Sequence, residues 1–297
     1  MRPRSWVIYR LTTFVLAVFL LLPSSGALAH GDSRPQKTGI LLAAFGTTMP
    51  EANAAYEKIE NRVRAAFPDI PVRWAYTSKM VRKKLAASGK AFDSPAQALA
   101  NMMDDDFTHV AVLTLHVIPG EEYHGLVRTA HAFSGLPKGM RKVLVTYPLL
   151  GAPDDLEASA KALLAMAPAD RSKNDAVIFM GHGTHHPGNA FYPAMQYYLS
   201  QEDELAFVGT VEGAPVLEDV IEELKAAKVE RAYLLPFMTV AGDHARNDMA
   251  GDQPDSWKSR LNAMGVETVT LLKGAGEYDP VIEIWLKHLR GALQHFE

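Results

Sequence analysis

The segment VIFMGHGTHH (177–186) places three histidines directly behind an apolar run that is typical of a buried strand. His182 lies between two glycines, and His185 and His186 come just before Pro187, a residue suited to begin a helix. An imidazole at such a position can bind a divalent metal, accept a proton, or simply form hydrogen bonds within a loop. The segment alone leaves these alternatives open, so the partners of His182 must decide between them.

Two further candidate ligands follow apolar runs later in the chain. Glu212 comes directly after the run 205–211, and His244 follows the run 231–237 within MTVAGDHARND. The carboxyl ends of parallel strands meet at one edge of a sheet, so we expect these two residues to lie beside His182. Two imidazoles and one carboxylate suit a borderline divalent ion such as Co²⁺, Fe²⁺, Ni²⁺ or Zn²⁺.

Ordinary structural roles remain the alternative for each of these residues. A histidine behind a strand is commonly a hydrogen-bonded loop residue, and Glu212, Asp243 and Asp248 are acids that could cap helical turns or lie in solvent. A hydrolase with a nucleophile elbow is disfavoured, because His182 occupies the place of the serine or cysteine. No Lys-Ser or Lys-Thr follows the glycines, which argues against a phosphate-binding loop.

The elements that must position these residues are eight short apolar runs. They are residues 38–45, 71–77, 109–115, 142–148, 175–180, 205–211, 231–237 and 266–272. Between them apolar residues recur at helical spacing, for example at Tyr56, Ile59 and Val63. Regular alternation of strands and helices predicts an α/β protein with parallel sheets that carry helices on both faces.

The chain is also loosely duplicated. ILLAAFGTT (40–48) parallels AVIFMGHGT (176–184), and AVLTLHVIPGEEYHGL (111–126) parallels AYLLPFMTVAGDHARN (232–247). Each half would hold a four-stranded parallel sheet flanked by helices, and a cleft between two such halves is a common ligand site.

The polar segment APADRSKN separates the two halves. We therefore predict an N-terminal α/β domain over 30–165 and a C-terminal α/β domain over 166–297 that carries the metal site.

Residues 1–29 have the pattern of a secretory signal peptide. Three arginines precede the apolar run LTTFVLAVFLLLP, and Ala27 and Ala29 form an Ala-x-Ala cleavage site. The run is shorter than the roughly 20 residues of a spanning helix, which favours cleavage over a retained membrane anchor. We predict a mature protein without a membrane span, in a bacterial periplasm.

The composition narrows the chemistry further. The 297 residues carry a formal charge of −4, and the mature chain is more acidic because the leader contains three arginines and no acid. This charge argues against a nucleic-acid partner. The chain contains no cysteine, so disulfides and thiolate ligands are excluded and any metal must use histidines and carboxylates.

Several segments resemble one known family. FMGHGTHH, GTVEG, LLPFMTVAGDHARNDMAGD and DSWKSRLNAMG resemble the anaerobic cobalt chelatases, the sirohydrochlorin cobaltochelatases of the class II chelatase group. LLAAFGTT, AYTSKMVRKKL, SPAQAL and LHVIPGEEY resemble the same family in the same order, so the likeness runs from about residue 38 to the end.

The resemblance implies metal insertion into sirohydrochlorin, a step of cobalamin biosynthesis, between two similar α/β domains. Co²⁺ is the expected metal, Fe²⁺ is the alternative, and no organic cofactor is required. Carried over by motif, His182 and His244 would be the catalytic histidines that bind the metal and accept pyrrole protons, and Glu212 would be the accompanying acid.

The substrate that the resemblance implies is rich in carboxylates, which need cationic and hydrogen-bonding groups at the rim of the cleft. Ser78, Lys79, Arg82 and Arg246 are candidates because they lie beside the family motifs. For Arg82 the alternative is the solvated face of a helix.

Two features depart from the family. An export signal is unexpected in an enzyme of corrin synthesis, and it favours an alternative function as a periplasmic carrier of haem, another tetrapyrrole or metal. Second, His124 and His131 lie seven residues apart, so they could share one helical face. They are either surface histidines or a second metal or haem site, with His124 as an axial ligand between the subunits of a homo-oligomer. Ferrochelatase-like insertion into protoporphyrin is disfavoured, because the motifs match the cobalt family more closely.

Overall fold

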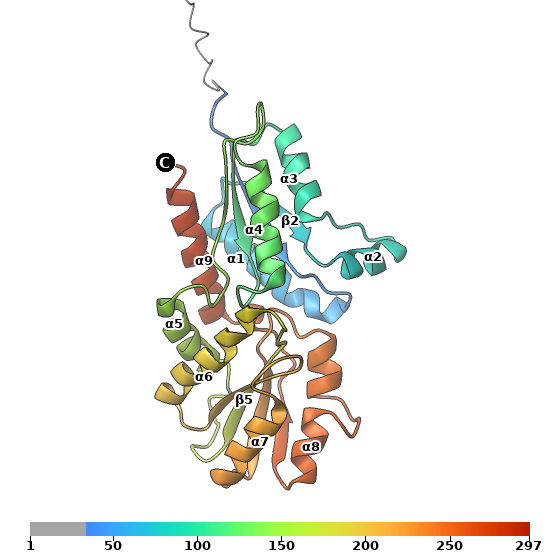
Figure 1. Cartoon of the computed structure of the whole chain (residues 1–297), viewed down its shortest axis with the longest axis vertical. Helices are drawn as coiled ribbons and strands as arrows, with labels where there is room; N and C mark the ends of the chain where they lie inside the picture. Colours follow the sequence, from blue (N-terminus) through green and yellow to red (C-terminus); the bar gives the residue numbers. More distant parts are fainter. Residues whose placement is uncertain (1–33) are drawn as a thin grey trace, which may run out of the picture. The chain divides into compact units, whose positions relative to one another are not determined.

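All eight predicted strands are present, and they form two parallel sheets. The computed structural model describes residues 34–297, so the predicted signal peptide lies outside the described residues (Figure 1). The first sheet contains β1 (Thr38–Ala44), β2 (Val72–Tyr76), β3 (His109–Thr114) and β4 (Lys142–Val145) in the order β2-β1-β3-β4. The second contains β5 (Ala176–Gly181), β6 (Ala206–Thr210), β7 (Arg231–Pro236) and β8 (Glu267–Thr270) in the order β6-β5-β7-β8.

The two sheets repeat one topology, which confirms the duplication seen in the sequence. Strands β1 and β5 occupy the same place in their sheets, as do β3 and β7. Every strand pair in both sheets is parallel. The predicted fold class, two four-stranded parallel sheets flanked by helices, is confirmed.

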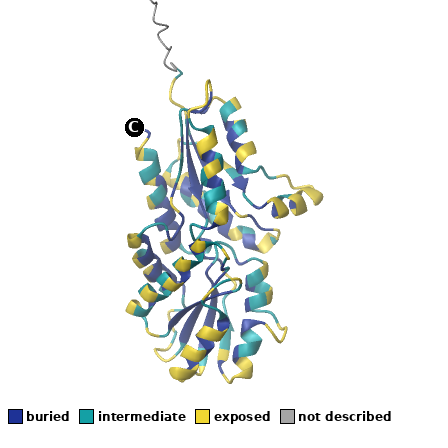
Figure 2. Ribbon diagram, viewed as in Figure 1, coloured by how far each residue is buried: buried dark blue, intermediate teal, exposed yellow. Residues whose placement is uncertain are grey.

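The central strands are apolar at every position because both of their faces are covered. In β1, Ile40 and Leu42 pack into one hydrophobic cluster, whereas Leu41 and Ala43 pack into another on the opposite face. Continuous apolar runs of this kind are typical of parallel strands that lie between two layers of helices. Figure 2 shows the strands buried and the outer faces of the helices exposed.

Helices cover both faces of each sheet. The longer helices are α1 (Asn53–Ala66), α2 (Lys79–Ala87), α3 (Pro95–Asp104), α4 (Glu121–Phe133), α5 (Pro153–Leu164), α6 (Phe191–Glu202), α7 (Leu217–Ala226), α8 (Trp257–Ala263) and α9 (Asp279–Gln294). The short helical turns are η1 (Pro50–Ala52), η2 (Pro187–Ala190), η3 (Ala245–Met249) and η4 (Ala275–Glu277). Helix α3 begins at a capping box between Ser94 and Gln97, with Pro95 at its first position.

The C-terminal helix α9 follows the second sheet in the sequence but packs mainly on the first half. It packs against β3 and α1 of the first half and against α5, the helix that links the halves. One hydrophobic cluster accordingly contains residues of both sheets, and residues 34–297 form one compact unit. The domain boundary between residues 165 and 166 stays a prediction.

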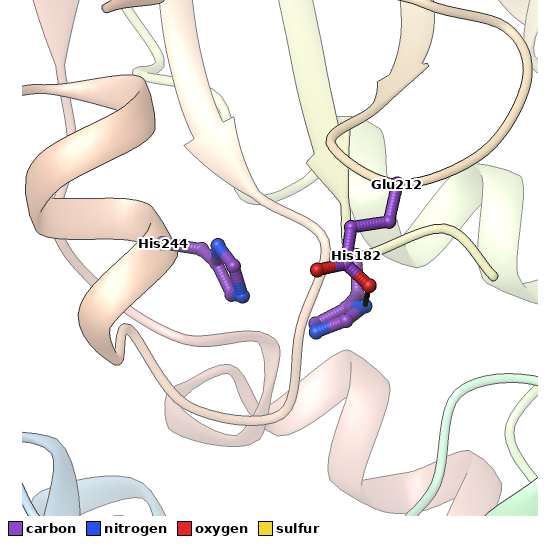
Figure 3. A group of neighbouring side chains, drawn as sticks. All are labelled: His182, Glu212 and His244. Carbon is purple, nitrogen blue, oxygen red and sulfur yellow. Dashed lines mark ion pairs between the residues drawn. The ribbon is translucent and has the colours of Figure 1, made fainter.

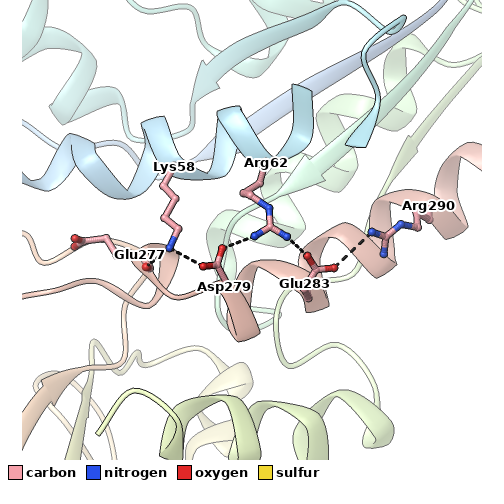
Figure 4. Close-up of polar contacts among 6 residues, drawn as sticks. All are labelled: Lys58, Arg62, Glu277, Asp279, Glu283 and Arg290. Atoms are coloured by element: carbon pink, nitrogen blue, oxygen red, sulfur yellow. Dashed lines mark hydrogen bonds and ion pairs between the residues drawn. The ribbon is translucent and has the colours of Figure 1, made fainter. Parts of the chain in front are cut away.

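A set of ion pairs fastens α9 to α1 (Figure 4). Lys58 and Arg62 of α1 both pair with Asp279, and Arg62 also pairs with Glu283. These side chains are 36–52% exposed, so water screens their attraction and each pair contributes little to stability.

No helix within residues 34–297 has both the length and the apolar character that crossing a membrane requires.

Candidate metal centre

Three loops of the second half bring the predicted ligands to one edge of its sheet. Strand β5 ends at Gly181, immediately before His182, while Glu212 lies two residues beyond β6 and His244 lies at the start of η3 after β7. The strand order reverses between β5 and β7, and ligands of parallel α/β sheets gather at such a switch point. The three side chains converge in Figure 3.

The distances between these side chains are those of a cluster able to hold one ion. One candidate ligand atom from each of His182, Glu212 and His244 lies within 4.8 Å of the other two. The Nδ1 atom of His182 is 3.8 Å from a carboxylate oxygen of Glu212, and the two imidazole rings are 4.6 Å apart between centroids and almost perpendicular. The side chains of His182 and Glu212 are 43% and 53% exposed, so the cluster is open to a large ligand.

Glycines allow the loop of His182 to approach its neighbours. Gly183 has a positive φ of +78°, and a Cβ atom on it would lie 2.5 Å from the backbone nitrogen of Gly213. A Cβ atom on Gly181 would lie 2.3 Å from the ring of Tyr192. Gly181 therefore makes room for a buried tyrosine, and Gly183 lets the loop of Glu212 lie close to His182.

The hydrogen bonds of the two histidines leave the same ring nitrogen unprotonated. Nδ1 of His182 lies 2.9 Å from the carbonyl oxygen of Gly183, and Nδ1 of His244 lies 2.5 Å from a carboxylate oxygen of Asp248. Carbonyl and carboxylate oxygens only accept hydrogen bonds, so in both rings Nδ1 must donate its proton. Each neutral ring then has an unprotonated Nε2, which is the form that binds a metal ion.

Asp248 is the residue whose contact the sequence did not reveal. The sequence allows Asp243 and Asp248 to be helix caps, but Asp243 accepts a hydrogen bond from Asn247 and Asp248 accepts one from His244. The available signal was the spacing of four residues between His244 and Asp248, which places both side chains on one face of a helical turn.

A further histidine lies at the equivalent edge of the first sheet. His116 comes two residues after β3, and its ring nitrogens lie 2.7 Å from Oγ1 of Thr114 and 3.4 Å from Oγ1 of Thr77. Burial lowers the pKa of His116 to about 4, so this imidazole is neutral at pH 7. The sequence contained it within LHVIPGEEY, but the motif gave no sign of its protonation state.

Comparison with known proteins identifies the family. Residues 38–294 match the cobalt chelatase (CbiK) family. The chain belongs to the CbiK family. The chelatase resemblance found in the sequence is thereby confirmed for nearly the whole described chain.

Two relatives in the family carry the same activity in their names. A sirohydrochlorin cobaltochelatase, CbiKC, of Nitratidesulfovibrio vulgaris is 43% identical over 257 residues, covering 86% of this chain and 91% of the relative. The sirohydrochlorin cobaltochelatase of Salmonella typhimurium is 34% identical over 259 residues, covering 86% of this chain and 97% of the relative.

A solved structure has the same fold as this protein. SirB from Bacillus subtilis, determined with Fe³⁺, superposes with a TM-score of 0.58 over 86% of this chain and 96% of its own. The two sequences are 14% identical, so this likeness supports the architecture alone.

The predicted substrate-binding residues of the first half differ in their availability. Ser78 is buried and caps α2, where its hydroxyl accepts a hydrogen bond from the backbone N–H of Val81. Arg82 donates hydrogen bonds to the carbonyl oxygens of Tyr76 and Thr77. Lys79 is exposed and is the first residue of α2.

Arg246 lies two residues after His244 and is half-buried. Its Nε atom is buried and forms no hydrogen bond with any residue of the described range 34–297. A buried guanidinium N–H without a partner is costly unless a ligand supplies an acceptor, which favours Arg246 as a contact for an anionic group.

The two histidines predicted to lie on an early helix are both on α4. His131 is exposed, whereas His124 is half-buried with its ring centroid 5.1 Å from that of His186 in the second half.

Proposed function

We propose that this protein inserts a divalent metal ion into sirohydrochlorin, with Co²⁺ as the preferred metal and Fe²⁺ as the alternative. The convergence of His182, Glu212 and His244 within 4.8 Å at an open edge is the observation that carries the proposal. Membership of the CbiK family and the names of two relatives support the same activity. No organic cofactor is part of the proposal.

In the proposed mechanism, the two histidines first bind the metal ion and later accept the pyrrole protons. Their unprotonated Nε2 atoms and the carboxylate of Glu212 hold the ion loosely, because three protein ligands leave coordination positions open for the pyrrole nitrogens. Metal insertion releases two pyrrole protons, and the imidazoles of His182 and His244 accept protons once the ion has moved onto the macrocycle. The ion is a substrate in this scheme.

The facing edge of the first half offers surfaces for the flat apolar macrocycle. Phe45, directly after β1, is 42% exposed, and Met80, at the start of α2, is 59% exposed. Large exposed apolar side chains near a polar site are typical of ligand-binding surfaces. We propose that Lys79 and Arg246 bind substrate carboxylates at the rim, and that Ser78 and Arg82 contribute chiefly by shaping the turn before α2.

An absorbance time course with sirohydrochlorin and Co²⁺ under anaerobic conditions tests this function. We expect residues 30–297 to accelerate formation of the metallated spectrum over a protein-free reaction. His244→Ala should lower the rate by at least about a hundredfold, because it removes a ligand and a proton acceptor together. His295→Ala, a change at an exposed histidine far along the sequence, should leave the rate unchanged.

The alternative function is a carrier of haem, another tetrapyrrole or metal, and the leader-like sequence of residues 1–29 is the observation that favours it. Wild-type protein that binds sirohydrochlorin yet never exceeds the protein-free rate would establish the carrier and reject the chelatase. Haem ligation by His124, and the subunit association that it would need, stay predictions. A Soret band that forms on haem addition and is lost in His124→Ala would support them.

We further propose that the protein is exported to the periplasm and cleaved after Ala29. N-terminal sequencing of the protein from a periplasmic fraction should then begin at His30. Recovery of the intact leader on a cytoplasmic protein would contradict this location.

A further inference from the structure

His186 occupies a contact between the two halves close to the metal centre. Its ring packs against that of His124, with 5.1 Å between centroids and 39° between the planes. Two residues after His186, Gly188 lies against the loop that precedes α4. A Cβ atom on Gly188 would lie 2.6 Å from the carbonyl oxygen of Pro119. The contact therefore joins the loop after β5 to the loop after β3.

The ring of His186 carries its proton on the nitrogen opposite to that of the two metal-binding histidines. The backbone N–H of Gly188 donates a hydrogen bond of 2.9 Å to Nδ1 of His186. An accepting Nδ1 has no proton of its own, so neutral His186 is protonated at Nε2. His182 and His244 have the reverse arrangement. Nε2–H of His186 can therefore donate a hydrogen bond, but a protonated Nε2 cannot bind a metal ion.

Hydrogen bonds fix this donor relative to the metal centre. The backbone N–H of His186 donates to Oγ1 of Thr184, and the N–H of Thr184 donates to the side-chain oxygen of Asn189. The amide of Asn189 in turn donates to the carbonyl oxygen of Ala214, in the loop that carries Glu212. A cavity of about 620 Å³ lies along the same loops, lined by Thr184, His185, Asn189, Val211, Glu212, Gly213 and Ala214.

We propose that His186 is a positioning residue that binds a peripheral carboxylate of the tetrapyrrole through Nε2–H. A carboxylate accepts hydrogen bonds and donates none, so it matches a histidine whose tautomer is set as a donor. The ring of His124 packs on His186 and forms no hydrogen bond with residues 34–297, so it does not compete for Nε2–H of His186. Neither Glu121 nor Glu122, one turn earlier on α4, pairs with either ring within that range.

This inference rests on the proposed function, because sirohydrochlorin supplies the carboxylate. If the inference holds, two histidines of one loop have different roles. His182 contacts the ion, whereas His186 orients the macrocycle over it. Both belong to the five-residue segment 182–186, so one loop would hold both the ion and the carboxylate.

The test compares His186→Leu, which removes the donor, with His186→Gln, whose amide N–H reaches a similar position. Two affinities are measured separately: that for sirohydrochlorin without metal, by quenching of tryptophan fluorescence, and that for Co²⁺ without tetrapyrrole, by calorimetry. We expect His186→Leu to weaken sirohydrochlorin binding about tenfold, the effect of losing one hydrogen bond to a charged group. Co²⁺ affinity should stay near the wild-type value, and His186→Gln should recover most of the loss in sirohydrochlorin affinity. His131→Leu, at an exposed histidine of α4, is the matched control.

Unchanged sirohydrochlorin affinity in His186→Leu would overturn the inference. Loss of Co²⁺ affinity with unchanged sirohydrochlorin affinity would also overturn it and would make His186 a metal ligand. If wild-type protein binds sirohydrochlorin but inserts no metal, the proposed function fails while the affinity comparison still decides the role of His186. If wild-type protein does not bind sirohydrochlorin, both proposals fail.

Discussion

At the scale of single residues, the tautomers of His182, His186 and His244 each follow from the atom beside Nδ1. Acceptors beside Nδ1 of His182 and His244 leave Nε2 unprotonated, whereas a donor beside Nδ1 of His186 places the proton on Nε2. Burial lowers the pKa of His116 to about 4. His186 therefore differs from His182 and His244 because a donor, and not an acceptor, lies within hydrogen-bonding distance of its Nδ1.

Asp248→Asn tests the orientation of His244. The amide of asparagine can donate to Nδ1, which would shift the ring proton to Nε2 and block metal binding. We expect Co²⁺ affinity to fall about tenfold to a hundredfold, as is usual when the partner of a metal-binding histidine is changed. Calorimetry with Co²⁺ measures this loss. Asp243→Asn, an exposed acid in the same segment, should leave the affinity unchanged, and equal losses in the two variants would contradict the role of Asp248.

His116 should make stability depend on pH. Its pKa is about 4 in the folded protein and about 6.5 in the unfolded chain, so between these values the unfolded state binds more protons. The contribution of His116 to the free energy of unfolding is therefore fully present above about pH 6.5. It decreases as the pH falls toward 4. The loss from this residue at pH 5 is at most about 2 kcal/mol, reduced where water reaches the ring. Urea unfolding of wild type and His116→Gln at pH 7 and pH 5 measures it; an equal pH dependence in both proteins would reject the assignment.

At the scale of elements, α5 and α9 connect the two halves. Asp155 on α5 is 3% exposed, and its carboxylate lies 3.0 Å from Nε2 of His288 on α9. Nδ1 of His288 donates to the carbonyl oxygen of Tyr147, at the start of the link between the halves. This buried pair and the exposed network of Figure 4 hold the same helix, but they differ in exposure to water.

Two substitutions should separate these contacts by their effect on stability. Asp155→Asn leaves a buried imidazole without its anionic partner, and we expect it to lower the free energy of unfolding by about 3 kcal/mol or more. Arg62→Ala removes ion pairs that water already screens and should cost less than about 1 kcal/mol. Urea unfolding at pH 6 gives both values. Comparable losses would mean that burial does not decide the strength of these contacts.

At the scale of the whole described chain, two similar sheets have different roles. Both have the same strand order, and Thr239 after β7 donates a hydrogen bond of 2.5 Å to the carbonyl oxygen of Leu115 after β3, so the two strand edges meet. The position after β5 holds His182, whereas the equivalent position after β1 holds Phe45. The repeated backbone supplies two facing edges. The side chains make one edge a candidate metal site and the other the surface that we propose for the macrocycle.

The sequence by itself determined the strands, their parallel arrangement, the duplication and the edge that carries His182, Glu212 and His244. These features depend on local patterns, because an apolar run specifies a buried strand and its last residue specifies the edge. The tertiary structure alone decided the ring tautomers, the contact of His124 with His186, the capping role of Ser78 and the position of α9 on the first half. The physical reason is that a hydrogen bond depends on an atom within about 3 Å, and loops distant in the sequence supply that atom only after the chain has folded.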